Sequence, residues 1–168
     1  RYVSKKSSNI KSVEDLKGKT IVSTAGTTNI KQATDLNVAK NMGMNIISAN
    51  GHPEAFQMVE TGRAVAFVMD DILLYTLVAQ SRSPGDYVIS SDALSLPEPY
   101  GIMLRKDDLP VKKVVDAATS ALYKSPQMAD LYAKWSTKPI PPKGLNLNVP
   151  FSPQLKKMFA NPTDAADP

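Results

Sequence analysis

The chain has 168 residues, of which 42% are hydrophobic and 21% are charged, a balance typical of a globular protein rather than a disordered one. It contains no cysteine and a single histidine, which excludes disulfides, thiolate zinc sites, cysteine nucleophiles and a histidine-rich metal site. The net charge of +4 is spread along the chain without a basic cluster interleaved with aromatic residues, so anionic small molecules are favoured and a nucleic-acid partner is not expected.

The first part of the chain predicts a capped turn, a strand and a helix in succession. Ser12 followed by Asp15, with Gly18 at the end, is typical of a short capped helical turn. Residues 20–24 are β-branched or small and predict a buried strand. Residues 29–42 then carry apolar side chains at helical spacing.

The turn between this strand and this helix, residues 24–28, is the most informative stretch of the chain. Gly26 allows a tight turn and leaves room for a ligand. The first amides of a helix have no internal partner, and the helix dipole favours negative charge there. With the hydroxyls of Thr24, Thr27 and Thr28, the turn is either a cradle for an anion such as a carboxylate or an ordinary threonine N-cap, which is the commoner arrangement.

The next strand is predicted at residues 45–49, and a helix follows from Pro53 to Gly62. His52 stands directly before this proline. Its imidazole can donate a hydrogen bond to an anionic ligand, and the alternative is a solvated N-cap residue.

Residues 64–69 form a continuous apolar run, as expected of a strand covered on both faces. Asp70 and Asp71 follow and open the next helix. A carboxylate at the end of a buried strand can pair with a substrate ammonium, and a charge-assisted hydrogen bond of this kind contributes roughly 1.5–3 kcal/mol. Asp71 is the natural N-cap, and in the alternative interpretation Asp70 is merely a second polar residue of the turn.

A short strand at residues 87–90 completes an alternation of strands and helices, which predicts an α/β fold with an open, mainly parallel sheet and helices on both faces. Ligands of such sheets bind at the carboxyl ends of the strands. Residues 24–28 and 70–71 should therefore lie at the same binding edge.

The pattern changes in the last third of the chain. Residues 100–105 predict a last strand, residues 111–124 an amphipathic helix, and Ser125-Pro126 the start of another helix. The two helices need an apolar partner that the preceding sheet cannot supply, which indicates a second lobe only partly present here. A short helix near residues 153–160 and a disordered tail at residues 161–168 are expected to end the chain.

Several chemistries lack their motif in this sequence. There is no Gly-x-Gly-x-x-Gly and no phosphate-binding loop with its lysine, so nucleotide binding is disfavoured and no cofactor or metal is expected. No apolar stretch approaches the roughly 20 residues of a membrane-spanning helix.

Several segments in order resemble the periplasmic solute-binding proteins of polar amino-acid ABC transporters (extracellular solute-binding family 3), with the glutamate/aspartate-binding branch nearest. They are Val13–Lys19, Ser23–Thr28, Ile46–Ala49 with His52, Glu60–Asp71, Tyr100–Asp108 and Pro139–Lys143.

The resemblance implies two α/β lobes joined by two crossing segments, with most of the first lobe absent from this chain. The implied divisions are a hinge crossing at 1–9, the second ligand-binding lobe at 10–98, a crossing at 99–106, and C-terminal helices and strap of the first lobe at 107–160.

The resemblance also implies a role for each candidate site residue. Thr24, Gly26, Thr27 and Thr28 match the turn that holds a ligand carboxylate. Asp70 matches the acid that binds the α-ammonium, and His52 matches a histidine that approaches the side-chain carboxylate of an acidic amino acid.

The implied function is therefore the capture of L-glutamate or L-aspartate in a cleft between lobes, in the periplasm, for delivery to an ABC permease. Two alternatives stay open: an enzyme on the same scaffold, such as a dehydratase with His52 as general base, and a ligand-sensing receptor domain. The isolated chain is expected to self-associate or swap elements through its exposed apolar helices.

Overall fold

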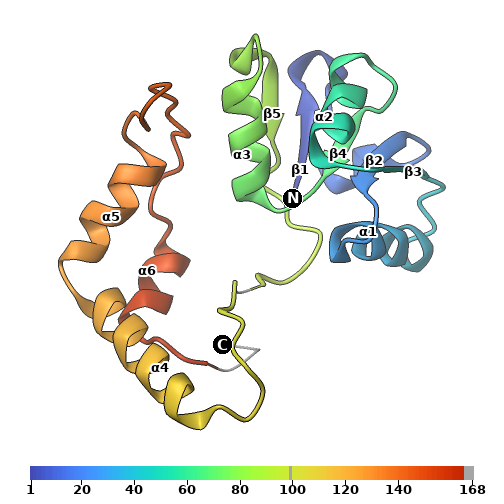
Figure 1. Ribbon diagram of the computed structural model, residues 1–168. Coiled ribbons are helices and arrows are strands. Elements are labelled where there is room, and N and C mark those ends of the chain that lie inside the picture. The colour runs from blue at the N-terminus through green and yellow to red at the C-terminus, as the bar shows by residue number, and fades with distance from the viewer. Residues whose placement is uncertain (99, 165–168) are drawn as a thin grey trace. The chain divides into compact units, whose positions relative to one another are not determined.

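The computed structural model describes residues 1–98 and 100–164. Its contacts divide the chain into two units, Arg1–Leu96 and Pro97–Pro168 (Figure 1). No helix among the described residues is long and apolar enough to cross a membrane. The elements of the first unit are β1 (Tyr2–Lys5), η1 (Lys6–Ser8), η2 (Val13–Leu16), β2 (Thr20–Thr24), α1 (Thr28–Ala39), β3 (Asn45–Ala49), α2 (His52–Glu60), β4 (Ala66–Val68), α3 (Asp71–Gln80), η3 (Pro84–Asp86) and β5 (Tyr87–Ile89). The second unit contains α4 (Leu109–Lys124), α5 (Gln127–Ser136) and α6 (Pro153–Ala160).

The first unit is built on a five-stranded sheet with the order β3-β2-β4-β1-β5. Strand β2 pairs in parallel with both β3 and β4. Strand β1 is antiparallel to both of its neighbours, β4 and β5, so β5 runs in the same direction as the other three strands. The predicted open and mainly parallel sheet is confirmed. Its one antiparallel strand comes from the segment for which the sequence predicts a hinge crossing, and the hinge role itself stays a prediction.

Helices cover both faces of this sheet because neighbouring residues of each strand point to opposite sides. On one face, α2 and α3 pack on the strands, and the buried residues of this first cluster include Val3, Val22, Phe56, Phe67 and Leu74. On the other face, η2 and α1 pack on the strands, and the buried residues of this second cluster include Tyr2, Leu16, Ile21, Ala33 and Val68. The strands thus supply adjacent residues to two separate cores, as a sheet covered on both sides requires.

Helix α1 ends earlier than the sequence predicts. It stops at Ala39, and Asn41 takes a left-handed backbone conformation with φ of 48°. The side chain of Asn37 explains the early end: its Oδ1 accepts from the amide of Met44 at 2.8 Å, and its Nδ2 donates to the carbonyl of Met44 at 3.1 Å. These two bonds fold the chain back toward β3 within a few residues.

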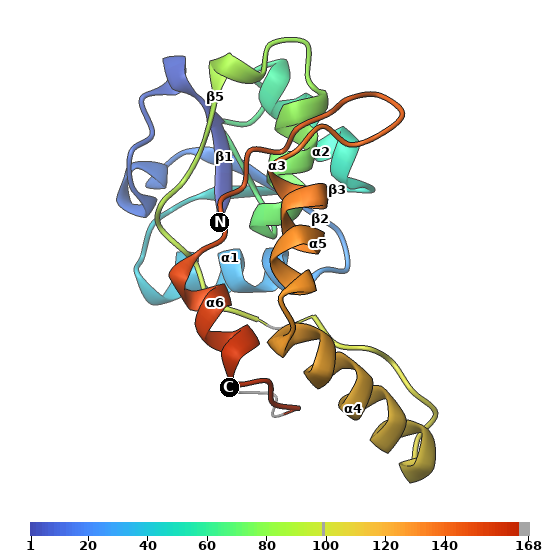
Figure 2. The same ribbon diagram turned by 90° about the vertical axis from the view of Figure 1, so that its left-hand side faces the viewer.

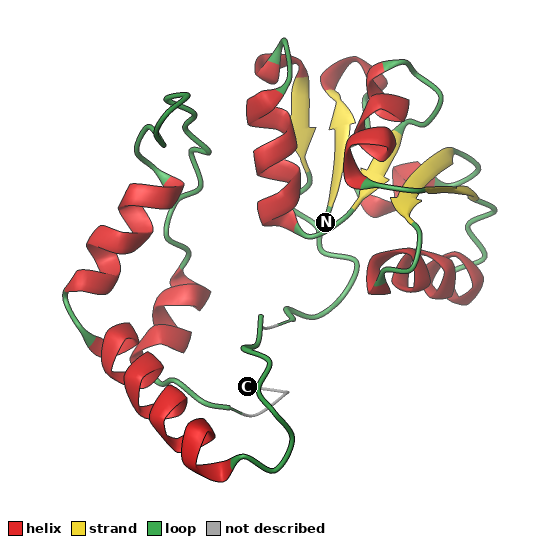
Figure 3. Cartoon of the chain, in the orientation of Figure 1, coloured by secondary structure: helices red, strands yellow, loops and turns green. Residues whose placement is uncertain are grey.

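The strand predicted at residues 100–105 is wrong. This segment is a loop (Figure 3), and the side chains of Ile102 and Met103 are exposed. A strand needs a neighbouring backbone to satisfy its amides and carbonyls, and no strand among the described residues pairs with this segment. Residues 100–105 therefore have no sheet to join among the described residues.

The second unit holds the helices predicted at residues 111–124 and 153–160, and both predictions are confirmed. Helix α5 follows α4 after a short turn (Figure 2). The small core of the second unit is aromatic: Tyr123 stacks on Phe159 with ring centroids 4.8 Å apart, and Tyr132 stacks on Phe151 with centroids 4.4 Å apart. Predictions for residues 165–168 of the tail lie outside the described residues.

Replacing Tyr2 with phenylalanine is expected to leave the free energy of unfolding unchanged or to raise it by about 1 kcal/mol. Tyr2 is 1% exposed, and its hydroxyl finds no hydrogen-bond partner within residues 1–98 and 100–164. The substitution removes a buried polar atom and keeps the ring. Urea unfolding of both proteins near neutral pH tests this, and a loss above about 1 kcal/mol would mean that the hydroxyl has a partner.

The same pair of proteins should diverge in alkali. Burial raises the pKa of Tyr2 from its ordinary value of 10.0 to about 12. Because the folded-state pKa is the higher one, the contribution of the neutral phenol is fully present below pH 10 and is lost as the pH rises toward 12. Wild-type stability should therefore fall more steeply than that of Tyr2→Phe across this interval.

Candidate functional site

The carboxyl ends of β2, β3 and β4 lie at one edge of the sheet because these strands run parallel. The register places Thr24 beside Ala49 and Ser23 beside Val68. The amide of Ala25 also donates to the carbonyl of Ala49 at 2.8 Å, which holds the ends of β2 and β3 together. The segments that follow these three strands therefore share this edge, which is called the ligand edge below.

The turn after β2 combines an N-cap with the first amides of a helix, which have no acceptor within the helix. Gly26 has a φ of +71°, a left-handed conformation that suits glycine. Thr27 is the N-cap of α1: its hydroxyl donates to the carbonyl of Thr24 at 2.7 Å and accepts from the amide of Ile30 at 3.4 Å. The N-cap interpretation is thus confirmed for Thr27. The amide of Thr28, the first residue of α1, has no carbonyl acceptor within the helix, because the first amides of a helix lack one.

Asp70 lies two residues beyond the end of β4, and its side chain reaches the start of α1. Its Oδ1 accepts a hydrogen bond of 3.0 Å from Nδ2 of Asn29, whose residue is only 7% exposed. Asp70 itself is half-buried. The bond ties the carboxylate to the helix whose N-terminus attracts anions, so a negative group and an anion-favouring group stand side by side at the ligand edge.

Asn29 is a site residue that the sequence does not predict. A polar residue in the first turn of α1, at a position that faces the sheet, was the available signal. Its partner lies 41 residues further along the chain, and nothing in the local pattern names that partner.

The N-cap predicted for Asp71 falls one residue earlier. Asp70 occupies the N-cap position of α3, without a side-chain bond to the helix, and Asp71 is the first helical residue. The carboxylate of Asp71 instead accepts from Nε of Arg1 at 3.3 Å. Both side chains are substantially exposed, so this ion pair contributes at most about 1 kcal/mol.

Arg1 was not singled out from the sequence, yet it bridges two strand ends at the ligand edge. Its guanidinium also donates to the carbonyls of Ser90 at 2.7 Å and Ser91 at 2.6 Å. The start of β1, the end of β5 and the start of α3 are therefore linked through one side chain.

His52 is the first residue of α2, and Gly51 holds the N-cap position, so the interpretation of His52 as a solvated N-cap is wrong. The imidazole is half-buried, and its Nδ1 lies 2.7 Å from Oγ1 of Thr24. The pair links the beginning of α2 to the end of β2. Thr24 is 6% exposed, so its hydroxyl lies beneath the surface of the ligand edge.

All six residues predicted for the site thus lie at the ligand edge, either at the end of a parallel strand, as Thr24 does, or in a segment that follows one. They are Thr24, Gly26, Thr27, Thr28, His52 and Asp70. Their chemistry is mixed: helix amides and an imidazole can donate to anions, and a carboxylate can accept from a cation. This combination complements a zwitterion better than it complements a purely anionic or cationic molecule.

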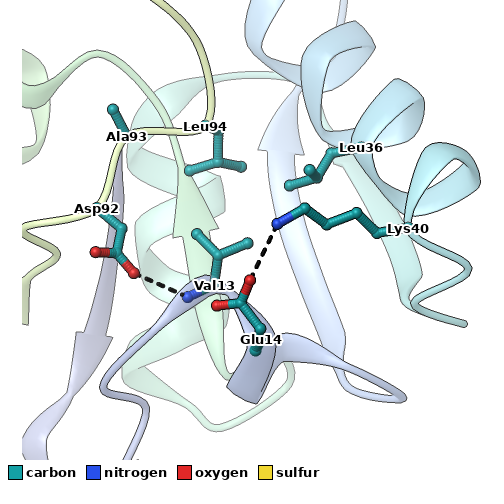
Figure 4. Close-up of a pocket in the computed structure, with 7 residues that line it drawn as sticks. All are labelled: Val13, Glu14, Leu36, Lys40, Asp92, Ala93 and Leu94. Atoms are coloured by element: carbon teal, nitrogen blue, oxygen red, sulfur yellow. Dashed lines mark hydrogen bonds and ion pairs between the residues drawn. The ribbon is translucent and has the colours of Figure 1, made fainter.

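A pocket of about 370 Å³ lies elsewhere on the first unit (Figure 4). Its lining consists of Val13, Glu14, Leu36, Lys40, Asp92, Ala93 and Leu94. Its charges are already satisfied, because Lys40 pairs with Glu14 at 3.0 Å and Asp92 accepts from the amide of Val13 at 3.1 Å. None of the predicted site residues lines it, so the ligand edge is the better candidate.

Comparison with known proteins finds relatives over almost the whole chain. No family model matches the chain. The L-glutamate/L-aspartate-binding protein of Pseudomonas aeruginosa is 54% identical over 166 residues, which cover 99% of this chain and 55% of the relative. The glutamate/aspartate import solute-binding protein of Escherichia coli is 41% identical over 166 residues, with the same coverage of 99% and 55%.

A solved structure is similar as well. An ancestral arginine-binding protein bound to arginine matches with a TM-score of 0.66 and 32% identity, covering 80% of this chain and 58% of that protein. The chain spans about half the length of the curated relatives it matches.

Proposed function

We propose that this chain, a homologue of the solute-binding proteins of amino-acid ABC importers with a periplasmic-binding-protein type of fold, supplies one lobe of such a binding protein. The complete protein captures L-glutamate or L-aspartate in a cleft between its lobes, in the periplasm, and delivers it to a permease in the membrane. The observation that carries the proposal is the meeting of the α1 N-terminus and Asp70 at one edge of the sheet, linked through Asn29.

Each charged group of an acidic amino acid has a proposed partner at the ligand edge. The turn at residues 24–28 receives the α-carboxylate through its amides and the hydroxyl of Thr28, Asp70 receives the α-ammonium, and His52 faces the side-chain carboxylate. Hydrogen bonds of this charge-assisted kind contribute roughly 1.5–3 kcal/mol each. The printed names of the two curated relatives support an acidic ligand. The same names describe binding proteins and not enzymes, so no observation favours the dehydratase or the receptor alternative.

The proposed organisation follows the divisions expected from the resemblance. Residues 10–98 form the second lobe, residues 1–9 and 99–106 cross between lobes, and residues 107–160 pack on the first lobe. The exposed apolar side chains of the second unit support this role, since Val114 is 68% exposed and Trp135 is 48% exposed.

The isolated chain is therefore expected to self-associate, because these apolar faces avoid water by packing on a second copy. Light scattering across a dilution series measures this. A monomer that persists at all concentrations, with Trp135 shielded from an aqueous quencher, would contradict the expectation.

A thermal-shift screen of the complete two-lobed protein against the twenty amino acids tests the proposed function. A ligand at 100 times its dissociation constant adds about 2.7 kcal/mol to the stability, so glutamate or aspartate should raise the melting temperature clearly. Stabilisation only by neutral or basic amino acids would reject the acidic ligand. A protein that no amino acid stabilises would reject the function itself.

A further inference from the structure

Thr24 contacts His52, and this contact indicates a role for Thr24 that its position in the turn at residues 24–28 does not predict. The distance between Thr24 Oγ1 and His52 Nδ1 is 2.7 Å, which is a short hydrogen bond between two side chains 28 residues apart. Within the described part of the chain this is the only hydrogen bond of the imidazole. The other ring nitrogen, Nε2, has no hydrogen-bond partner among the described residues.

The surroundings of this pair decide which group donates. A neutral imidazole has one N–H and one bare nitrogen, so the hydroxyl either donates to Nδ1 or accepts from it. Thr24 is 6% exposed, and a buried O–H left without an acceptor is costly, which favours donation to Nδ1.

We propose that Thr24 is a positioning residue: its hydroxyl donates to Nδ1 of His52, fixes the ring as the Nε2–H tautomer, and holds that N–H ready for the side-chain carboxylate of the ligand. The proposal rests on the proposed function for its ligand. Thr24 then determines specificity through His52 rather than by touching the α-carboxylate. A neutral imidazole that is already oriented can donate to the carboxylate without first gaining a proton.

The hydrogen bond between Thr24 and His52 can be measured in this chain without any ligand, because His52 is the only histidine of the sequence. Nitrogen NMR of the histidine-labelled chain, at a pH where the imidazole is neutral, should show the Nε2–H tautomer. The Nδ1 resonance should shift when Thr24→Val removes the hydroxyl and should stay near its wild-type position in Thr24→Ser. The Nδ1–H tautomer, or an Nδ1 resonance that Thr24→Val leaves unchanged, would overturn the proposal. Thr24→Ala provides a second removal of the hydroxyl if valine disturbs the strand.

The effect on specificity is measured in the complete protein with L-glutamate and L-glutamine as probes, by calorimetry with displacement where binding is weak. Thr24→Val should reduce the preference for glutamate over glutamine about tenfold, which equals the loss of roughly 1.4 kcal/mol. Thr24→Ser should remain within about twofold of wild type because it keeps the hydroxyl. The carbonyl of Thr24, which accepts from Thr27, survives both substitutions.

Asn29→Ala is the matched control. Asn29 supports Asp70, which in the proposed site binds the α-ammonium common to both probes. Removal of the Asn29 side chain should lower the affinities for glutamate and for glutamine by the same factor. If Thr24→Val also lowers the affinities for glutamate and glutamine by the same factor, the preference between them does not depend on Thr24, and the proposal is overturned. If the wild-type protein binds neither probe, the proposed function fails, and the NMR measurement still decides whether Thr24 orients His52.

Discussion

The Asp70→Asn variant of the complete protein is expected to bind its amino acid more weakly by roughly 2–5 kcal/mol. In the proposed site Asp70 is the counter-charge of the α-ammonium. An asparagine has the same shape and no charge, so the ammonium would be left inside the cleft without an anion. Most of the loss is the cost of this unpaired charge rather than the strength of one contact.

The structure makes this substitution a clean test. Asn29 donates to Oδ1 of Asp70 at 3.0 Å, and the amide oxygen of an asparagine can accept the same bond. The carbonyl of Asp70 accepts from the amides of Leu73 and Leu74, and these backbone bonds do not depend on the side chain. The variant should therefore fold like the wild type.

Asp71→Asn is the matched control, because it removes the same charge one residue away. Its side chain is 52% exposed and pairs with Arg1, so its removal should change the affinity by less than about threefold. Titration calorimetry of both variants gives the comparison. If Asp70→Asn also changes the affinity by less than about threefold, Asp70 does not belong to the site.

Phe67→Ala is expected to lower the free energy of unfolding of the first unit by about 3–5 kcal/mol. Phe67 is fully buried in β4, a strand between β2 and β1, and its ring belongs to the core beneath α2 and α3. Truncation removes the apolar contacts of the ring and leaves a cavity that the surrounding strands cannot close. Because typical domains are stable by only about 5–15 kcal/mol, this loss brings the unit close to unfolding.

Urea unfolding followed by far-UV circular dichroism measures this loss. Fluorescence is the wrong probe, since the single tryptophan, Trp135, lies in the second unit. Val38→Ala is the control: Val38 is 76% exposed, and its truncation should change the stability by no more than about 0.5 kcal/mol. A loss below about 1 kcal/mol for Phe67→Ala would show that the core does not depend on this ring.

Local patterns predicted the elements of the first unit well because their signals lie within a few residues. The turn at residues 12–18 is an example. Asp15 accepts hydrogen bonds from the amides of Lys11 and Ser12 at 2.9 Å each, and these short-range bonds lower the pKa of its carboxyl group. The parallel alternation of strands and helices then placed residues 24–28 and Asp70 at one edge.

The features that the sequence did not predict, namely the roles of Asn29 and Arg1 and the loop at residues 100–105, share a different cause. Each depends on a partner that is distant in the sequence or absent from the described residues. The bond between Asn29 and Asp70 spans 41 residues, and that between Arg1 and Ser90 spans 89. Likewise, residues 100–105 have the side chains of a strand, but the part of the chain that the structure describes offers no strand to pair with them. Propensity describes what a segment can form, and pairing decides whether it forms.

The place of β1 in the sheet also has a consequence for how the chain is made. Val3 is paired with Phe67 on one side and with Ile89 on the other. If the chain folds while it is synthesised at about 5–20 residues per second, β1 waits on the order of ten seconds for both of its neighbours. During that interval its backbone is unpaired and the side chains of Tyr2 and Val3 are not buried, which makes it a target for chaperones and for aggregation. Completion of the sheet is therefore a late event in biosynthesis, set by the arrival of residues 87–89.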